Sequence, residues 1–158
     1  YSLTALIRDV LVRLEPLLED RIVRTHLPDD LLLVELDYLQ VDQVLTNLIE
    51  NAVRYTPSES PIDVSAQLDG EHVVMSVADR GPAIPPADLA RIFDKFYRVI
   101  HGQHPGGYPM GSGLGLAVCK GLVEAHGGRI WAELRDSGGL IVFVELPLGE
   151  QEHEKGEM

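Results

Sequence analysis

The spacing of apolar residues between positions 37 and 56 predicts the helix around which the chain is organised. Four apolar residues of this stretch, DYLQVDQVLTNLIENAVRYT, recur at the i, i+3, i+4, i+7 spacing of one buried helix face: Leu45, Leu48, Ile49 and Ala52. Three polar residues repeat at helical spacing on an adjacent face: Asn47, Asn51 and Arg54. The pattern indicates an amphipathic helix with a polar edge.

Two asparagines inside a helix are unusual, because their short amides compete for backbone hydrogen bonds. The carbonyl oxygens of Asn47 and Asn51 are hard ligands that suit a magnesium ion in contact with phosphate. Arg54 is spaced to meet a phosphate oxygen. A polar edge facing water, with Glu50 and Arg54 as an i,i+4 ion pair, explains the same residues, so the helix alone leaves both interpretations open.

Before this helix, the pattern predicts one more helix and two strands. Ser2 is a suitable cap for a helix over residues 3–21, which Pro16 kinks or restarts. Its apolar face consists of Leu3, Leu6, Ile7, Val10, Leu11 and Leu14. Residues 21–27 and 31–36 read as strands on either side of a turn at Pro28.

After it, the pattern predicts two hairpins and a second long helix. Strands at 62–68 and 72–78 meet at Asp69 and Gly70, and strands at 129–134 and 140–146 meet at a turn formed by Ser137, Gly138 and Gly139. A helix over 113–126 is expected to direct four residues inward: Leu114, Val118, Leu122 and Ala125. Because helices and hairpins alternate without a β-α-β rhythm, we expect an α+β fold, a two-layer sandwich with a mixed sheet and helices on one face.

Composition limits the functions that this pattern can serve. The 158 residues suit one domain, and a net charge of -12 argues against a nucleic-acid-binding protein. The single cysteine, Cys119, excludes an internal disulfide and fits a reducing compartment. No apolar run approaches the ~18 residues of a membrane span. The first residue is Tyr1, so we expect a piece of a longer protein, and residues 149–158 are charged and expected to be disordered.

Two glycine-containing segments are candidates for nucleotide contacts. Residues 79–84, Asp-Arg-Gly-Pro-Ala-Ile, end a strand, and a carboxylate there can accept a hydrogen bond from the amino group of a heterocycle. An ordinary strand-end turn explains them as well. Residues 111–115, Gly-Ser-Gly-Leu-Gly, open the second helix, whose free N–H groups attract phosphate. Neither segment is a dinucleotide fingerprint or a P-loop, and the motifs of eukaryotic-type protein kinases are absent.

A long segment without periodicity separates the two glycine segments. Residues 91–110, RIFDKFYRVIHGQHPGGYPM, are rich in Gly, Pro and His. Loops of this length in a compact domain are usually lids or binding loops, so we expect a lid at about residues 97–112. Phe93, Phe96 and Tyr97 are expected to anchor its start to the core.

Four segments, taken together, resemble the ATP-binding boxes of bacterial sensor histidine kinases: NLIENAVRYTP, DRGPAIP, IFDKFYR and GSGLGLAVCKGLVEAHGG. The resemblance covers residues 37–146 and implies the Bergerat-type (GHKL) ATP-binding fold, shared with gyrase, mismatch-repair ATPases and heat-shock chaperones, over a domain at 1–148. The segment WAE at 131–133 is similar to potassium-responsive sensor kinases.

The resemblance also implies roles for single residues, with ATP and Mg²⁺ as cofactors. Asn51 would bind magnesium, with Asn47 beside the phosphates as a second candidate ligand. Arg54 and Arg98 would contact phosphates. Three residues would surround the adenine: Tyr55, Asp79 and Gly81. The remaining expected ATP-binding residues belong to the two glycine boxes: Ile84, Gly111, Ser112, Gly113, Leu114 and Gly115.

Three features depart from the family pattern. Ala83 stands where a glycine is usual, and Leu140 replaces a common threonine near the adenine. The lid carries His101, His104 and Pro105 in place of a basic run. The first two changes affect the stiffness of a loop and one polar contact, and the third puts closure over the phosphates in doubt.

The histidines determine which step this chain can perform. Sensor kinases phosphorylate a histidine on a helical hairpin, and none of the six histidines lies in such a pattern. We therefore expect no catalytic residue in this chain, and a phosphoacceptor on a separate dimerisation domain of the same protein. A response regulator would be an indirect partner, the isolated domain a monomer, and the whole protein anchored in the inner membrane with this domain in the cytoplasm. The alternatives are an anti-sigma-type serine kinase, a GHKL ATPase and a non-catalytic nucleotide-binding module.

Overall fold

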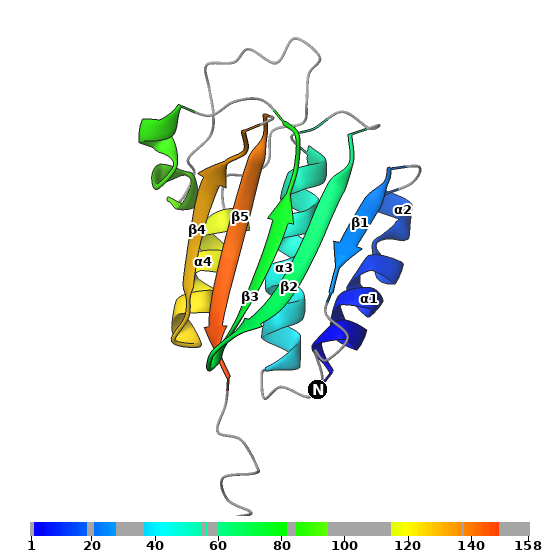
Figure 1. Cartoon of the computed structure of the whole chain (residues 1–158), viewed down its shortest axis with the longest axis vertical. Helices are drawn as coiled ribbons and strands as arrows, with labels where there is room; N and C mark the ends of the chain where they lie inside the picture. Colours follow the sequence, from blue (N-terminus) through cyan, green and yellow to red (C-terminus); the bar gives the residue numbers. More distant parts are fainter. Residues whose placement is uncertain are drawn as a thin grey trace, which may run out of the picture.

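The computed structural model describes residues 2–18, 21–27, 37–54, 56, 60–81, 85–94, 115–136 and 138–148. In these ranges a five-stranded sheet forms one layer, and the longer helices lie against one of its faces (Figure 1). The strands follow the order β1 (Val23–His26), β2 (Ile62–Asp69), β3 (His72–Ala78), β5 (Leu140–Pro147) and β4 (Arg129–Leu134). β1 runs parallel to β2 and the other pairs are antiparallel, which confirms the predicted mixed sheet with helices on one face.

The helices of the described ranges are α1 (Leu3–Arg13), α2 (Glu15–Leu18), α3 (Tyr38–Arg54) and α4 (Gly115–Ala125), with 3₁₀ turns η1 (Pro86–Asp88) and η2 (Arg91–Phe93). The Ser2 cap is confirmed, because its hydroxyl accepts a hydrogen bond of 3.3 Å from the Ala5 N–H. The restart at Pro16 is also confirmed. α1 ends before Leu14, and Pro16 occupies the first turn of α2, where a missing N–H removes no helical bond.

The core lies between the helices and the facing side of the sheet. The predicted stripe of α3 is fully buried, with Leu45, Leu48, Ile49 and Ala52 each at most 3% exposed. Alternate residues of the central strands meet it: Ile62, Val64, Ala66, Val73, Met75, Val77, Val142 and Val144. Strand alternation therefore directs the other residues of each strand to the opposite, helix-free face.

The predicted inward face of the second helix is wrong in part. Cys119 and Val123 are the buried residues of α4, whereas Val118 is 45% exposed and Ala125 lies at the surface. Leu122 packs partly against the core as expected, and Leu114 lies outside the described residues. α4 is apolar almost all round, so its periodicity does not select one face, and packing against α3 and β4 selects it instead.

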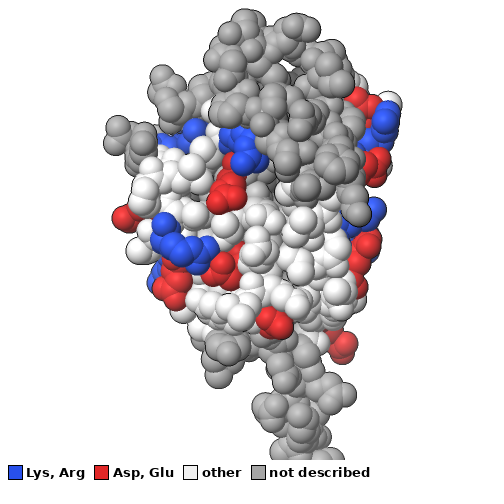
Figure 2. Space-filling model, turned by 180° about the vertical axis from the view of Figure 1, so that it is seen from behind, with Lys and Arg blue, Asp and Glu red and all other residues white. Residues whose placement is uncertain are grey.

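Both hairpins form as predicted. Gly70 has φ +67° at the β2–β3 turn, the backbone geometry for which glycine is favoured there. The predicted strand at 31–36, the whole lid at 97–112 and the tail at 149–158 lie outside the described residues. None of the helices within the described ranges has the length and apolar content to cross a membrane. On the helix-covered side, acidic and basic groups lie beside one another (Figure 2).

Candidate functional site

Three elements that carry predicted site residues converge at one end of the sheet, the upper end in Figure 1. β3 ends there at Ala78, α3 ends there at Arg54, and α4 begins there at Gly115. Six of the predicted residues lie on or directly after these elements and are described: Asn47, Asn51, Arg54, Asp79, Gly81 and Gly115. The other seven lie outside the described residues: Tyr55, Ile84, Arg98, Gly111, Ser112, Gly113 and Leu114.

Asp79, directly after β3, is a buried carboxyl group held by backbone bonds. Asp79 is 7% exposed, and its Oδ1 accepts hydrogen bonds from the N–H groups of Gly81 at 2.8 Å and Leu140 at 3.3 Å. The Asp79 N–H in turn donates to the Leu140 carbonyl at 2.9 Å. Within the described part of the chain, no donor is bonded to Oδ2. One oxygen therefore fixes the orientation of the carboxyl group, and the other can receive a donor from a ligand.

Burial raises the pKa of the Asp79 carboxyl above its ordinary value, because the charged form loses water. The two N–H bonds from Gly81 and Leu140 lower it, and the positive charges of Arg135 and Arg21 lower it further, without offsetting the burial. Because little water competes at such a site, a hydrogen bond to this carboxyl group is stronger than one at the surface.

Two residues of the β4–β5 hairpin hold the backbone of Asp79, and neither was predicted as a site residue. Arg135 Nη1 donates to the Asp79 carbonyl at 3.1 Å. Gly139 has φ +107°, and a Cβ at this position would overlap the Asp79 carbonyl oxygen and lie 2.7 Å from the Arg80 Cα. The sequence marked Gly139 only as a turn residue, because its contact depends on β5 pairing with β3.

A buried arginine joins the end of α3 to the start of β2. Arg21 is 9% exposed, and its Nη1 donates to Thr56 Oγ1 at 2.6 Å and to the Ser60 carbonyl at 3.0 Å. Thr56 Oγ1 donates to the Ala52 carbonyl at 2.7 Å, one of the free carbonyls at the helix end. Sequence reasoning missed Arg21, whose only signal was a charged residue at the start of a strand pattern.

The polar edge of α3 contains two amides with different surroundings. Asn47 Oδ1 accepts from Gln43 Nε2 at 3.2 Å, and the nearby Asn47 amide lowers the pKa of the Cys119 thiol, against the larger effect of burial. Asn51 is half-buried and makes no side-chain hydrogen bond to any described residue. Asn51 therefore offers the freer carbonyl oxygen to a cation, and Arg54, also half-buried, follows one turn later.

These residues fit a magnesium ion that is shared with phosphate. The described residues contain no group of three or more His, Cys, Asp or Glu side chains that would hold a metal by themselves. Magnesium commonly takes only one or two protein oxygens and completes its shell with water and phosphate. The amide oxygens of α3 are ligands of that kind.

The first turn of α4 leaves space for a ligand. A Cβ placed on Gly115 would meet no heavy atom within 4 Å, so packing does not require glycine there. The first N–H groups of a helix are unpaired and favour anions. Further along α4, burial raises the pKa of the Cys119 thiol to about 12, and this thiol donates to the Val44 carbonyl at 3.6 Å. Cys119 is thus an unreactive contact between α3 and α4.

Comparison with known proteins identifies related sequences. The family described as "Histidine kinase-, DNA gyrase B-, and HSP90-like ATPase" matches residues 36–150. Sensor protein KdpD of Escherichia coli strain K12 is 40% identical over 146 residues, which cover 92% of this chain and 16% of KdpD. Sensor histidine kinase WalK of Bacillus subtilis strain 168 is 38% identical over 131 residues, covering 82% of this chain and 21% of WalK. The chain therefore spans a small part of the length of these relatives.

Solved structures show the same arrangement. The catalytic domain of histidine kinase ThkA has a TM-score of 0.80 and 31% identity, with 93% of this chain and 95% of that chain covered. Full-length ShkA in complex with AMPPNP has a TM-score of 0.80 and 27% identity, covering 96% of this chain and 31% of ShkA. The chain belongs to the family of histidine kinase-, DNA gyrase B- and HSP90-like ATPases, as an ATP-binding catalytic domain of the sensor histidine kinase type.

Proposed function

We propose that this domain binds Mg-ATP at the upper end of the sheet and donates the γ-phosphate to a histidine on a separate dimerisation domain of the same protein. The buried Asp79 carboxyl group is the observation that carries this proposal, because Oδ1 is fixed by two N–H groups and Oδ2 receives no donor from the described residues, which suits recognition of one amino group. A response regulator would then receive the phosphoryl group. In support, a ThkA structure in complex with response regulator TrrA resembles this chain with a TM-score of 0.78 and 30% identity, over 93% of this chain and 40% of that one.

At the adenine end, Asp79 Oδ2 accepts a hydrogen bond from the exocyclic amino group. Guanine presents a carbonyl at the equivalent position, which would face a carboxylate oxygen without a proton between them. Gly81, whose N–H holds Oδ1, keeps the backbone close beneath the base.

At the phosphate end, Asn51 and Arg54 near the end of α3 would act together with the first turn of α4, where a Cβ on Gly115 would meet no heavy atom within 4 Å. Phosphoryl transfer depends on positioning and on neutralising charge, and a bound magnesium ion supplies part of that charge. Asn51, with Asn47 as the second candidate, would hold the ion, and Arg54 would orient a phosphate oxygen.

The same edge of α3 argues against ATP hydrolysis as the main activity. A gyrase-like or chaperone-like ATPase needs a glutamate at position 47 to activate water, and this position holds an asparagine whose Oδ1 accepts a hydrogen bond from Gln43. An amide does not accept a proton from water at neutral pH. The acceptor histidine and its general base would therefore come from the dimerisation domain.

Nucleotide selectivity tests this proposal. Isothermal titration of the 158-residue chain with ATP and with GTP, each with Mg²⁺, should give at least about tenfold tighter binding of ATP, since one charge-assisted hydrogen bond contributes roughly 1.5–3 kcal/mol. Equal affinities for the two nucleotides would rule out Asp79 as the residue that reads the base.

A further inference from the structure

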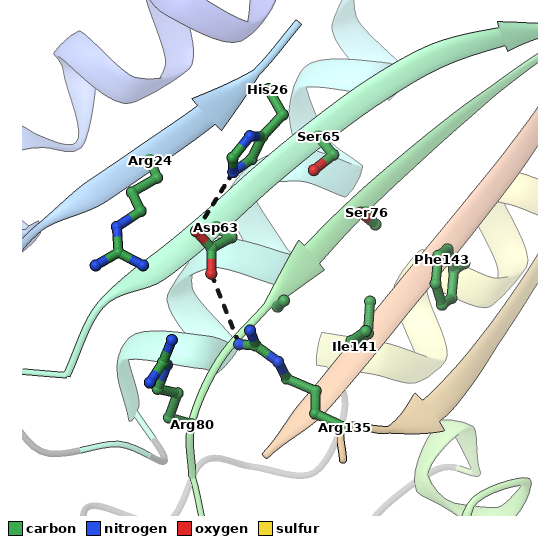
Figure 3. A pocket seen from close by; sticks show the side chains of 10 residues that line it. Arg24, His26, Asp63, Ser65, Ser76, Arg80, Arg135, Ile141 and Phe143 are labelled. Atoms are coloured by element: carbon green, nitrogen blue, oxygen red, sulfur yellow. Dashed lines mark ion pairs between the residues drawn. The ribbon is translucent and has the colours of Figure 1, made fainter. Parts of the chain in front are cut away.

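The face of the sheet away from the helices contains a cavity of about 400 Å³ (Figure 3). Strand register accounts for its shape. Arg24, Asp63, Ala78 and Ile141 form one cross-strand row, and His26, Ser65, Ser76 and Phe143 form the next. In these rows the residues of β2 and β3 are smaller than those of β1 and β5, the strands on either side of them. A hollow therefore remains over β2 and β3, within the usual volume range of small-molecule sites.

The lining of this cavity is positively charged in a protein whose net charge is -12. Three guanidinium groups line it, those of Arg24, Arg80 and Arg135, with one carboxylate, Asp63. Arg135 Nη1 lies 3.6 Å from Asp63 Oδ2, and His26 Nε2 lies 3.6 Å from Asp63 Oδ1. Arg24 and Arg80 form no ion pair with any residue that the structure describes. Asp63 thus balances one of three arginines, in contrast to the mixed charges of the helix side (Figure 2).

The cavity also has an apolar wall with a fixed geometry. Ile141 and Phe143 of β5 line it, and the Phe143 ring stacks on the Trp131 ring of β4 with centroids 5.2 Å apart. Ser65 and Ser76 place two hydroxyl groups at its floor. The cavity therefore combines a positively charged subsite, which can bind an anion between arginines, with an apolar surface beside it.

We propose that this cavity binds a small organic phosphate. Its phosphate group would lie between Arg24 and Arg80, because one guanidinium group can donate two parallel hydrogen bonds to two phosphate oxygens. The two negative charges of the phosphate would also match the two arginine charges that Asp63 does not balance. Its apolar body would rest on Ile141 and Phe143. This cavity differs from the candidate nucleotide site, because Ala78 lines it and strand alternation directs the side chain of the next residue, Asp79, toward the opposite face. Arg135 contacts both sites, since it lines the cavity and also donates to the Asp79 carbonyl.

Phenyl phosphate is a suitable probe, with inorganic phosphate and phenol as its two halves. Titration of the ¹⁵N-labelled 158-residue chain with saturating AMPPNP and Mg²⁺ present should give saturable shifts of the Ser65, Ser76 and Phe143 amides. Inorganic phosphate should bind several-fold more weakly than phenyl phosphate, and phenol should not bind. No saturable shift on the sheet, or equal affinity for phenyl phosphate and inorganic phosphate, would overturn the proposal.

Three variants assign the binding to the cavity. Arg24→Gln should lower the affinity for phenyl phosphate at least fivefold, because it removes one positive charge that no carboxylate balances. Asp63→Asn should strengthen binding, because it removes the competing carboxylate. The control Arg8→Gln changes an exposed arginine on α1, away from the cavity, and should leave affinity unchanged. The proposal would be contradicted if Arg24→Gln bound phenyl phosphate with unchanged affinity, or if the amide shifts were confined to α3 and α4. Either result would mean that phenyl phosphate binds outside the cavity.

Discussion

At the scale of single residues, Asp79 combines two opposing physical requirements. Exclusion of water strengthens its hydrogen bonds, but the same burial raises its pKa and makes its charge costly. Between the ordinary pKa of the unfolded chain and the raised pKa of the fold, the folded protein binds more protons. The contribution of Asp79 to stability is therefore highest below this window and falls as pH rises through it.

The substitution Asp79→Asn should separate binding from stability. The amide oxygen can still accept from Gly81 and Leu140, and no charge is buried, so the melting temperature at neutral pH should not fall. Affinity for ATP should fall at least about tenfold, because the outward NH₂ group would oppose the adenine amino group. Calorimetry and thermal unfolding measure the two quantities, with Asp94→Asn, an exposed carboxylate, as the control. Unchanged ATP affinity would contradict the proposed role.

Two adjacent glycines allow a matched test of how Asp79 is held. Gly138 and Gly139 both have positive φ, but a Cβ on Gly138 would meet nothing within 4 Å, whereas one on Gly139 would overlap the Asp79 carbonyl. Gly138→Ala should cost only the backbone strain, about 1–2 kcal/mol of unfolding free energy. Gly139→Ala should lower the unfolding free energy by roughly 1–3 kcal/mol more, which is the usual cost of overpacking. It should also lower the affinity for ATP. Equal unfolding free energies in urea for the two variants would refute the contact.

At the scale of elements, the sequence predicted those segments whose periodicity is unambiguous. α3 and the strands β2, β3 and β5 have one clear period each, and their burial follows it. The inward face of α4 was partly wrong, because apolar residues surround that helix and only packing distinguishes Cys119 from Val118. Arg135 and Gly139 were not predicted as site residues, because their contacts with Asp79 join segments 56 and 60 positions apart in the chain.

The spacing of polar residues on α3 predicts a difference between its two amides. Asn51→Ala should abolish the magnesium-dependent part of ATP affinity and leave the fold intact, because Asn51 makes no side-chain bond to the described residues. Gln43→Ala, on the same edge but bonded only to Asn47 among the described residues, serves as the control and should retain magnesium dependence. Titrations with and without Mg²⁺ measure this difference. If ATP binding by Asn51→Ala still depended fully on magnesium, the metal would be bound by residues other than Asn51.

At the scale of the whole molecule, the sheet supports two faces with different chemistry. One face is covered by α1, α3 and α4 and ends at the candidate nucleotide site, and the other is open and contains the arginine-lined cavity (Figures 1 and 3). The two-layer architecture was predictable from the order of helices and hairpins. The cavity was not, because it depends on which residues of neighbouring strands lie in register.

The central claim is that this domain donates a phosphoryl group to a histidine that it does not itself contain. Because transfer depends on positioning, the chain alone should bind ATP and neither label itself nor hydrolyse ATP appreciably. A separate helical hairpin from the full-length protein, with its acceptor histidine, should restore labelling weakly, since docking loses the effective concentration of a tether.

Incubation with ATP radiolabelled at the γ-phosphate, with and without that hairpin, tests this claim most directly. The predicted result is label on the hairpin only, stable to alkali and lost in acid, as phosphohistidine is. Asn51→Ala should remove the label, and Gln43→Ala should keep it. Robust labelling of the isolated chain, or an acid-stable phosphoserine on the partner, would contradict the assignment as a histidine kinase catalytic domain.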